Sequence, residues 1–456
     1  MPGSAPTHSA NLEDREAGLK RELSVRLLGM IAIGQSIGTG LFLGSGISAQ
    51  MAGPAVILSF VIGALITYTV MLALSEMTTA HPTAGSFGVY AERYLGPWAG
   101  IVTRYTYCMA QIVAIGGQIV AVAIYCRFWL PDTPSWIWIT GFSIVLMAIN
   151  VLHVGSFGEA EYWFSLIKVL AICFLLIFGV VLFAGIGVPR QGLAAYTAHG
   201  GFFPHGAAGV WAAVTMAVFS FYGLEAAAVG SGETRDPRTS VPKALRRIMA
   251  RLSLFYIGSM IILVGIVPWN EMGIAESPFV LVYRRIGIPG AAGLMNIVVL
   301  TAALTSINAN LYTSSRMVFS LARSRQAPAW LGRLSARGVP RNAVLISGVG
   351  LGIAAMIHWF FADSAYVYML GISLFGAIFC WFMILATHVR FRDARIPYGS
   401  VAGMCILLAV LATMAFLPEM RVAWIAGPPW LLLISALYFR KYRARGQRFD
   451  SIGDRQ

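Results

Sequence analysis

The stretch Leu27–Ser48, LLGMIAIGQSIGTGLFLGSGIS, decides the class of fold to which this chain belongs. It has no charged residue, contains six glycines, and is long enough to cross a bilayer as a helix. Glycine weakens a helix and frees its backbone, and non-helical backbone is tolerated in a membrane only where protein or a cavity surrounds it. The glycines around Ile37-Gly38-Thr39-Gly40 therefore predict either a broken helix that forms a binding site or a small-residue face that packs against another helix.

The composition of the whole chain is typical of a membrane protein. Of its 456 residues, 58% are hydrophobic and 11% are charged, whereas a soluble domain carries about 25% charged residues. The first 24 residues are polar, so we expect no cleavable signal peptide. The five cysteines lie in or at the ends of hydrophobic stretches without metal-ligand spacing, which favours small packing residues over a metal or cofactor site.

A hydropathy window of about 19 residues predicts twelve transmembrane helices. They divide into residues 25–185 (helices 1–5), 208–388 (helices 6–10) and 397–439 (helices 11 and 12), between polar tails at 1–24 and 440–456. An odd number of helices in each half inverts the second half relative to the first, as in many secondary transporters. The expected fold is an all-α integral membrane protein with a 5+5 inverted repeat and two additional helices.

The placement of the positive charges predicts the orientation of the chain. With the N-terminus inside, the cytoplasmic segments hold 26 of the 33 Lys and Arg residues. This bias predicts that both termini lie in the cytoplasm. The net charge of +14 is then explained by topology and by some attraction to anionic lipid, and a nucleic-acid partner is not expected.

A second interruption falls in the equivalent helix of the second half. The segment Val218–Glu225, VFSFYGLE, places polar groups, a glycine and an acid inside helix 6. A pair of glycine-interrupted helices in corresponding positions indicates a substrate site near the middle of the membrane. We therefore expect helices 1 and 6 to be unwound at mid-membrane.

The two interruptions offer complementary groups to a small zwitterion or anion. Backbone N–H groups at Gly38-Thr39-Gly40 suit a carboxylate. Carbonyls left without partners near Ser36 and in Phe219–Tyr222 suit an ammonium group, and the Phe219 ring is placed to close over the substrate. The predicted substrate-binding residues are Ser36, Ile37, Gly38, Thr39, Gly40, Phe219, Ser220, Tyr222 and Gly223.

Three ionisable residues are further functional candidates. Lys168 lies about 12 Å along helix 5 from its predicted start, where a charge usually faces a cavity. It is predicted to gain and lose a proton during transport, or else to snorkel to the membrane surface. Glu225 is either a second proton site or an acceptor that holds the unwound backbone. Glu76 precedes a Pro- and Gly-containing segment, 82–91, that is expected to form a tight loop, and it is predicted to pair with basic residues as an inner gate.

Five motifs along nearly the whole chain resemble an amino acid permease of the amino acid–polyamine–organocation superfamily, in its bacterial amino acid transporter family. They are Gly34–Phe42, Glu76–Tyr90, Glu161–Lys168, Phe219–Glu225 with Gly232–Pro237, and Arg323–Pro328 with Gly338–Pro340.

This resemblance implies the leucine-transporter type of fold and a place in the bacterial inner (plasma) membrane. It implies that Thr39 and Gly40 bind the substrate carboxylate and that Phe219 is an aromatic gate. It also implies that the ammonium group of Lys168 occupies the sodium site of related symporters, which favours proton coupling, and that Glu225 senses protons. The chain departs from the aromatic and basic amino acid branches at Arg104-Tyr105, where those branches have a Gly-Trp-type pair, and this favours a neutral amino acid.

The predicted function is therefore import of an amino acid with protons. An enzyme is not expected, because no His, Asp and Ser residues cluster in the sequence. The alternatives are an amino acid exchanger, a carrier of polyamines or cationic amino acids, and a nutrient sensor that does not transport.

Overall fold

The computed structural model of the chain describes residues 25–81, 83, 86–152, 157–185, 194–229, 237–335, 338–393 and 395–443. All regular elements in these ranges are helical, which confirms the predicted all-α class. The predicted tail at 1–24, most of the tail at 440–456 and the motif residues Gly232–Asp236 lie outside the described residues.

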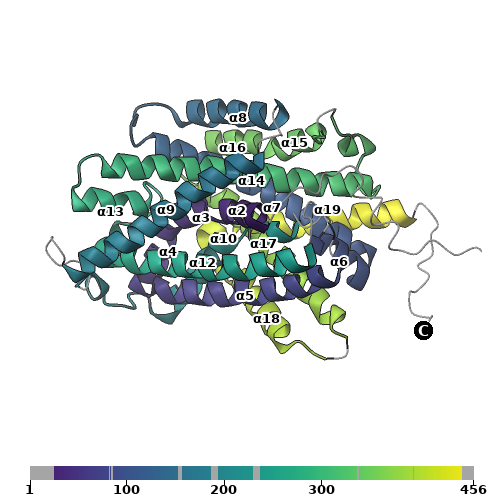
Figure 1. Ribbon diagram of the computed structural model, residues 1–456, viewed down its shortest axis with the longest axis horizontal. Helices are drawn as coiled ribbons and strands as arrows, with labels where there is room; N and C mark the ends of the chain where they lie inside the picture. Colours follow the sequence, from purple (N-terminus) through teal and green to yellow (C-terminus); the bar gives the residue numbers. More distant parts are fainter. Residues whose placement is uncertain are drawn as a thin grey trace, which may run out of the picture.

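Most of the long helices run along one common axis (Figure 1). In chain order the α-helices are α2 (Val25–Ser36), α3 (Thr39–Phe42), α4 (Gly44–Ala52), α5 (Val56–Ala80), α6 (Ser86–Leu95), α7 (Pro97–Cys126), α8 (Ser135–Leu152), α9 (Phe157–Ala184), α10 (Gly206–Phe221), α11 (Ala226–Val229), α12 (Pro237–Ile266), α13 (Pro278–Ile286), α14 (Ala291–Arg323), α15 (Arg341–Ser347), α16 (Val349–Phe360), α17 (Ala365–Phe391), α18 (Tyr398–Phe416) and α19 (Val422–Arg443).

Ten helical segments of the described ranges are long and apolar enough to cross a membrane. The chain is therefore a multi-pass membrane protein. Two of the twelve predicted helices are not counted separately among these ten segments. The first is divided into α2, α3 and α4, of which α4 continues through a 3₁₀ turn into α5, and the fourth, Ser135–Val151, is shorter than the others. The number twelve and the inverted repeat stay predictions.

Both predicted interruptions are present in the backbone. α2 ends at Ser36, Ile37 and Gly38 are not helical, and the chain resumes as α3. In the second half α10 ends at Phe221 and the chain resumes as α11 at Ala226. α2 packs against α9, α12 and α14, and α10 packs against α3, α4 and α5. The two interruptions therefore meet in the interior, where Figure 1 shows α2, α3 and α10 near the centre of the bundle.

Two segments that the sequence left outside the long helices form short amphipathic helices. The tight loop expected at 82–91 is wrong from Ser86 onward, because α6 begins there and buries Phe87, Tyr90 and Ala91 on one face. Between α12 and α14, α13 buries Phe279 and Val282. Apolar residues three or four positions apart line one face of a helix. In α6 and α13 this pattern is too short to be predicted as a membrane span.

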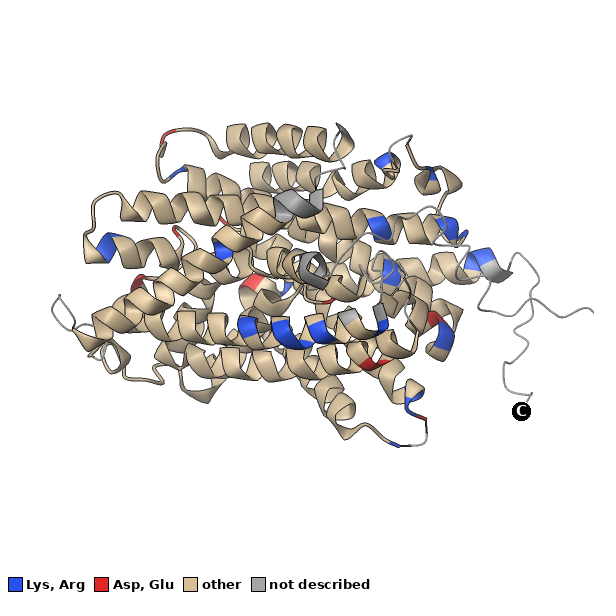
Figure 2. Ribbon diagram, viewed as in Figure 1, with Lys and Arg blue, Asp and Glu red and all other residues tan. Residues whose placement is uncertain are grey.

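Positive charge gathers at one end of the bundle. In Figure 2, Lys and Arg are densest toward the end that carries α6 and the last residues of α19. Hydrogen bonds join residues of different elements at this end. Arg93 contacts His81 and Arg392 donates to Glu76. Lys441 donates to the carbonyl of Arg325 at 3.0 Å. We call this the basic end.

Candidate functional site

The break between α2 and α3 leaves backbone groups at the centre of the bundle. The N–H of Ile37 donates to the carbonyl of Ile33 at 2.8 Å, at the end of α2. The N–H of Gly38 donates to the carbonyl of Ser36 at 3.0 Å. Gly38 is extended, with φ −138° and ψ −150°, so Thr39 begins a new helical turn. The first N–H groups of a helix have no partner from a preceding turn. Thr39 and Gly40 are both buried, and their N–H groups are those predicted to meet a carboxylate.

The last carbonyls of α2 are taken by side chains from three neighbouring helices. Lys168 Nζ on α9 donates to the carbonyl of Gly34 at 2.7 Å. Ser306 Oγ on α14 donates to Gln35 at 3.0 Å, and Tyr256 OH on α12 donates to Ser36 at 2.8 Å. The expectation that the carbonyl of Ser36 has no partner is therefore wrong in this conformation. Burial explains the difference, because an unpaired carbonyl in an apolar interior is costly.

Lys168 is fully enclosed. Its side chain is 1% exposed and its ammonium group points to the C-terminal end of α2, where a cation is favoured by the helix dipole. The snorkelling alternative is thereby excluded. The ammonium group joins α9 to the broken helix and does not reach the membrane surface.

The second break is shaped by Gly223 and Glu225. Tyr222 is extended, and Gly223 has φ +108°, a conformation that residues with a side chain rarely adopt. The N–H of Gly223 donates to Glu225 Oε2 at 3.1 Å, and Trp381 Nε1 donates to the same oxygen at 3.3 Å. Glu225 thus does hold the unwound backbone. Its other oxygen, Oε1, is buried and has no hydrogen-bond partner among the described residues.

The glycines allow the two breaks to touch. A Cβ atom added to Gly40 would lie 3.1 Å from Phe219 Cδ1 and 3.1 Å from Ser220 Cα. One added to Gly223 would lie 2.9 Å from Gln35 Cγ. Phe219 is 8% exposed, so its ring covers Gly40. The structure brings together the predicted residues of both breaks and shows them in a closed arrangement, in which the glycines also serve packing.

Several polar side chains beside the breaks were not predicted. Gln111 on α7 donates to Tyr222 OH at 3.3 Å, and the rings of Tyr107 and Tyr222 lie 6.3 Å apart. Both polar atoms of the Gln35 side chain, Gln111 Oε1 and Tyr107 OH are buried without a hydrogen bond of good geometry among the described residues, although Tyr107 OH lies next to both glutamines. Buried polar atoms of this kind usually contact water or a ligand. Glutamines inside apolar helices, as at 35, 111 and 118, were the signal that could have found this cluster.

A second unpredicted group joins α7 to α14. Gln118 donates to Ser306 Oγ at 2.9 Å and accepts from Asn310 Nδ2 at 3.0 Å. Because Ser306 in turn bonds α2, this chain of hydrogen bonds fixes α14 and α7 against the end of the broken helix. A Cβ atom at Gly38 would lie 2.6 Å from Ser306 Oγ, so glycine is needed there for this approach.

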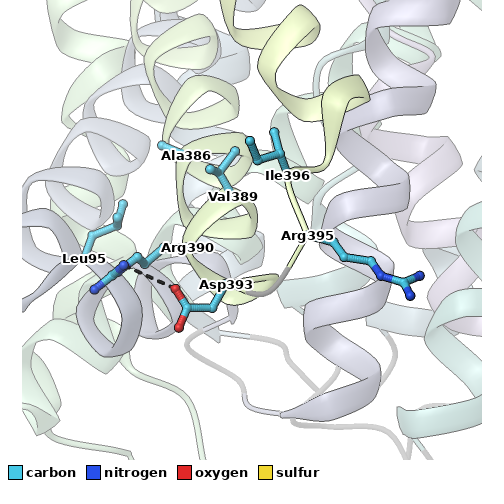
Figure 3. Close-up of a pocket in the computed structure, with 7 residues that line it drawn as sticks. All are labelled: Leu95, Ala386, Val389, Arg390, Asp393, Arg395 and Ile396. Atoms are coloured by element: carbon cyan, nitrogen blue, oxygen red, sulfur yellow. Dashed lines mark hydrogen bonds and ion pairs between the residues drawn. The ribbon is translucent and has the colours of Figure 1, made fainter.

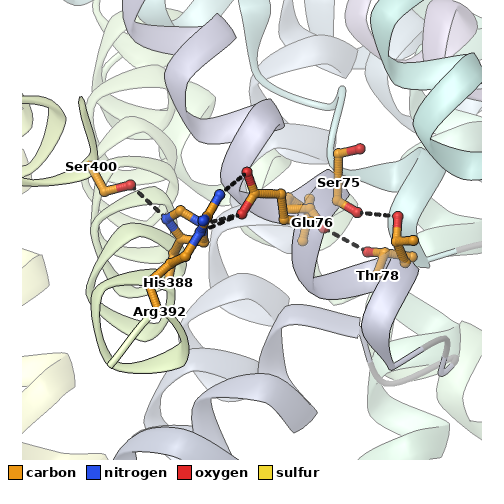
Figure 4. A network of polar contacts seen from close by, with 8 residues as sticks. Ser75, Glu76, Thr78, His388, Arg392 and Ser400 are labelled. Atoms are coloured by element: carbon orange, nitrogen blue, oxygen red, sulfur yellow. Dashed lines mark hydrogen bonds and ion pairs between the residues drawn. The ribbon is translucent and has the colours of Figure 1, made fainter. Parts of the chain in front are cut away.

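Glu76 lies at the basic end of α5 and pairs with the end of α17 (Figure 4). Arg392 contacts both of its oxygens, at 2.8 and 2.9 Å, and His388 Nε2 lies 2.9 Å from Oε2. His388 Nδ1 is 2.8 Å from Ser400 Oγ on α18. The hydrogen bond with Glu76 raises the pKa of the Arg392 guanidinium, so Arg392 stays charged. Glu76 therefore pairs with basic residues, and these come from a distant helix end.

We expect Arg392→Gln to lower the uptake rate at least about twofold and Glu76→Gln to lower it by at least as much, because Glu76 is the partner of both Arg392 and His388. The double variant should add nothing to the effect of Glu76→Gln, because that change alone already removes the ion pair with Arg392. Stability should change little, since the pair is exposed and such pairs contribute little. Arg333→Gln is the control, because Arg333 is exposed and follows Gly332, which packs against Arg323 at the end of α14. Additive effects in the double variant would show that Glu76 and Arg392 act separately.

Arg104 holds another junction of the basic end. It is fully buried, forms an ion pair with Glu92 of α6, and donates to Ser324 Oγ at 3.5 Å. The neighbouring Tyr105 OH donates to the carbonyl of Gln326 at 2.9 Å. Arg104-Tyr105 therefore fastens the segment after α14 to α6 and α7, which is a structural role.

An open pocket of about 370 Å³ lies away from the breaks, at the ends of α6 and α17 (Figure 3).

Within the described ranges no group of three or more His, Cys, Asp or Glu side chains is arranged to hold a metal ion.

Comparisons with known proteins place the chain in a family. Residues 28–448 match the family described as amino acid permease. The aromatic amino acid transport protein AroP of Escherichia coli (strain K12) is 36% identical over 437 residues, which cover 93% of this chain and 96% of AroP. The protein named "Uncharacterized amino acid permease YtnA" of Bacillus subtilis (strain 168) is 36% identical over 447 residues, covering 94% and 96%. A helical membrane protein with this match along nearly its whole length belongs to the amino acid permease family, whose members are transporters and not enzymes.

Proposed function

We propose that this protein imports an amino acid across the bacterial inner membrane, that protons drive the uptake, and that both termini lie in the cytoplasm. The observation that carries the proposal is the contact between the two helix breaks, Gly40 against Phe219 and Gly223 against Gln35. Two discontinuous helices that meet in the interior are how secondary transporters form a substrate site. The similar placement of the breaks in the two halves supports the inverted repeat.

The substrate is proposed to lie between the breaks. Its carboxylate accepts hydrogen bonds from the backbone N–H groups of Thr39 and Gly40. Ile37 and Gly38 form the non-helical turn that presents these N–H groups. Its ammonium group donates hydrogen bonds to the carbonyl oxygen of Ser36 and to backbone carbonyl oxygens of the second break, which comprises Phe219, Ser220, Tyr222 and Gly223. The Ser36 oxygen already accepts from Tyr256 OH and from the Gly38 N–H. Because a carbonyl oxygen has two lone pairs, the ammonium group must displace one of these donors when substrate binds.

Phe219 is proposed as the gate of this site. In the closed arrangement its ring lies against Gly40, where the substrate carboxylate is to bind. The ring must therefore move, or α3 must separate from α10, before substrate can enter. Glu76 and Arg392 hold a second contact at the basic end, which supports the proposed inner gate.

Lys168 and Glu225 are the proposed proton sites, one at each break. A charged Lys168 donates to Gly34 at 2.7 Å, and hydrogen bonds from a charged group are about twice as strong as neutral ones. Loss of its proton therefore weakens the hold on α2. Protonation of Glu225 would likewise weaken its acceptance of the Gly223 N–H. Each proton change is thus linked to one of the two breaks that bind substrate.

The side chain of the substrate is proposed to face α7, where Tyr107, Gln111 and Tyr222 meet Trp381, whose ring lies 6.4 Å from that of Tyr222. Aromatic walls with an uncharged amide group suit a neutral side chain better than a cation. Relatives are named aromatic amino acid transport proteins, which makes Phe, Tyr and Trp the first substrates to test.

The test is uptake of labelled amino acids into sodium-free proteoliposomes with and without an inward proton gradient. We expect uptake of a neutral amino acid above its external concentration only with the gradient, and its collapse when a protonophore is added. Uptake that ignores the gradient and requires amino acid inside the vesicles would identify an exchanger. Competition by polyamines or by lysine would contradict the neutral substrate, and binding without any uptake would indicate a sensor.

A further inference from the structure

The pocket of Figure 3 combines an apolar wall with a charged rim. The wall is made by Leu95, the last residue of α6, by Ala386 and Val389 on α17, and by Ile396 before α18. The rim holds Arg390, Asp393 and Arg395. A volume of about 370 Å³ is within the range of sites for small ligands. Its lining suits a molecule that is apolar on one side and anionic on the other.

The surroundings of the pocket place it at the edge of the membrane layer. It lies at the basic end, where α17 ends and α18 begins. Ile396 is 64% exposed and Tyr398 is 80% exposed, although both follow a helix that crosses the membrane. Tyrosine is enriched at membrane–water interfaces. Exposed apolar side chains at this level face the lipid headgroups and the part of the acyl chains next to them, so the ligand that the pocket meets first is a lipid.

The charges of the rim are available to an anion. Arg392, from the same segment, is engaged by both oxygens of Glu76. Arg390 has only a 3.3 Å contact with Asp393, and both of these side chains are highly exposed, so the pair is weak. The Arg395 side chain has no partner among the described residues, and Figure 3 shows Arg390 and Arg395 on the two sides of the apolar wall. Two guanidinium groups beside one acid leave a net positive rim.

We propose that this pocket binds an anionic phospholipid. Arg390 and Arg395 extend away from each other in Figure 3, and both exposed side chains turn toward the apolar wall to contact the headgroup phosphate. The upper part of an acyl chain then lies against Leu95, Val389 and Ile396. Basic pockets between transmembrane helices on the cytoplasmic side bind anionic headgroups in this manner. Bound lipid would join α6 to the start of α18 beside the Glu76–Arg392 pair. The proposal rests on the proposed cytoplasmic position of the basic end, but not on which amino acid is transported or on what drives transport.

The test is native mass spectrometry of the full-length protein with equal amounts of phosphatidylglycerol and phosphatidylethanolamine. We expect a preferred phosphatidylglycerol adduct whose affinity falls about fivefold in Arg395→Gln and in Arg390→Gln, since one basic residue near an anionic lipid surface contributes about that factor. Asp393→Asn should raise the affinity, because it removes the opposing charge. A structural defect would not produce these opposite signs. Arg333→Gln removes the same charge at the basic end outside the pocket, and its adduct should match that of wild type.

Two results would overturn the proposal. An equal loss of adduct in Arg333→Gln would show attraction to the whole basic end and no defined site. Displacement of the adduct by millimolar inorganic phosphate, with equal binding of both lipids, would show that the pocket holds free phosphate and not lipid. If either arginine variant fails to fold, Asp393→Asn alone still decides the matter, because unchanged or weaker lipid binding in it contradicts the proposed rim.

Discussion

Lys168→Met is expected to lower proton-driven uptake at least about tenfold, because about 1.4 kcal/mol corresponds to tenfold and a lost hydrogen bond to a charged group costs about 1.5–3 kcal/mol. The variant removes the ammonium group that bonds the carbonyl of Gly34 and leaves that carbonyl buried without its partner. It also removes the proposed proton carrier. The measurement is initial uptake per folded protein, with and without a proton gradient. Lys243→Met, which removes an exposed charge, should leave uptake unchanged.

Lys168→Arg separates the two roles of this residue. Arginine keeps a positive charge that can bond α2, but it does not lose its proton in proteins. If Lys168 carries the proton, this variant retains substrate binding and exchange while uptake no longer responds to the gradient. Full gradient dependence in Lys168→Arg would assign the proton to Glu225, which Glu225→Gln then tests in the same assay. Unchanged uptake in Lys168→Met would contradict any role of this residue in transport.

Gly223→Ala is expected to abolish measurable uptake and to lower thermal stability. At φ +108° an alanine is strained by about 1–3 kcal/mol. Its Cβ would also lie 2.9 Å from Gln35 Cγ and 3.3 Å from the backbone of Gln35 and Ser36, so α10 would be pushed off the end of α2. The measurements are uptake and the melting temperature in detergent.

Gly96→Ala is the matched control for this variant. Gly96 has nearly the same φ, +102°, but an added Cβ meets nothing within 4 Å. It should therefore lose stability through backbone strain alone and keep its uptake. Equal loss of uptake in both variants would show that strain, and not the contact between the breaks, is what transport cannot tolerate.

Much of the fold was predictable because its signals are local. Long apolar stretches and clustered basic residues follow from the cost of exposing charge and backbone to lipid, so the helical class and most spans are readable from the chain. The breaks were also predictable, since glycines at 38, 40 and 223 mark backbone that a straight helix does not use. The short helices α6 and α13 were not predicted, because each of them buries only a narrow apolar face over about three turns.

The site was predictable only in part, because its hydrogen bonds join residues far apart in the chain. Lys168 stands out as a charge in an apolar helix, but nothing local indicates that it bonds Gly34. Tyr256 and Ser306 are ordinary residues in the sequence, and they became important only as donors to the end of α2. The same holds for Glu76, whose partner Arg392 is 316 residues away.

The sequence by itself determined that this protein is a helical membrane transporter of the amino acid permease family with two interrupted helices, because composition, hydropathy and motif order are properties of the chain. Only the tertiary structure decided which groups occupy the ends of those interruptions. There the carbonyl of Ser36, expected to be free, accepts from Tyr256 of α12, and the carbonyls of Gly34 and Gln35 before it accept from side chains of α9 and α14. The physical reason is that a buried polar group must find a partner, and that partner is chosen by packing in three dimensions.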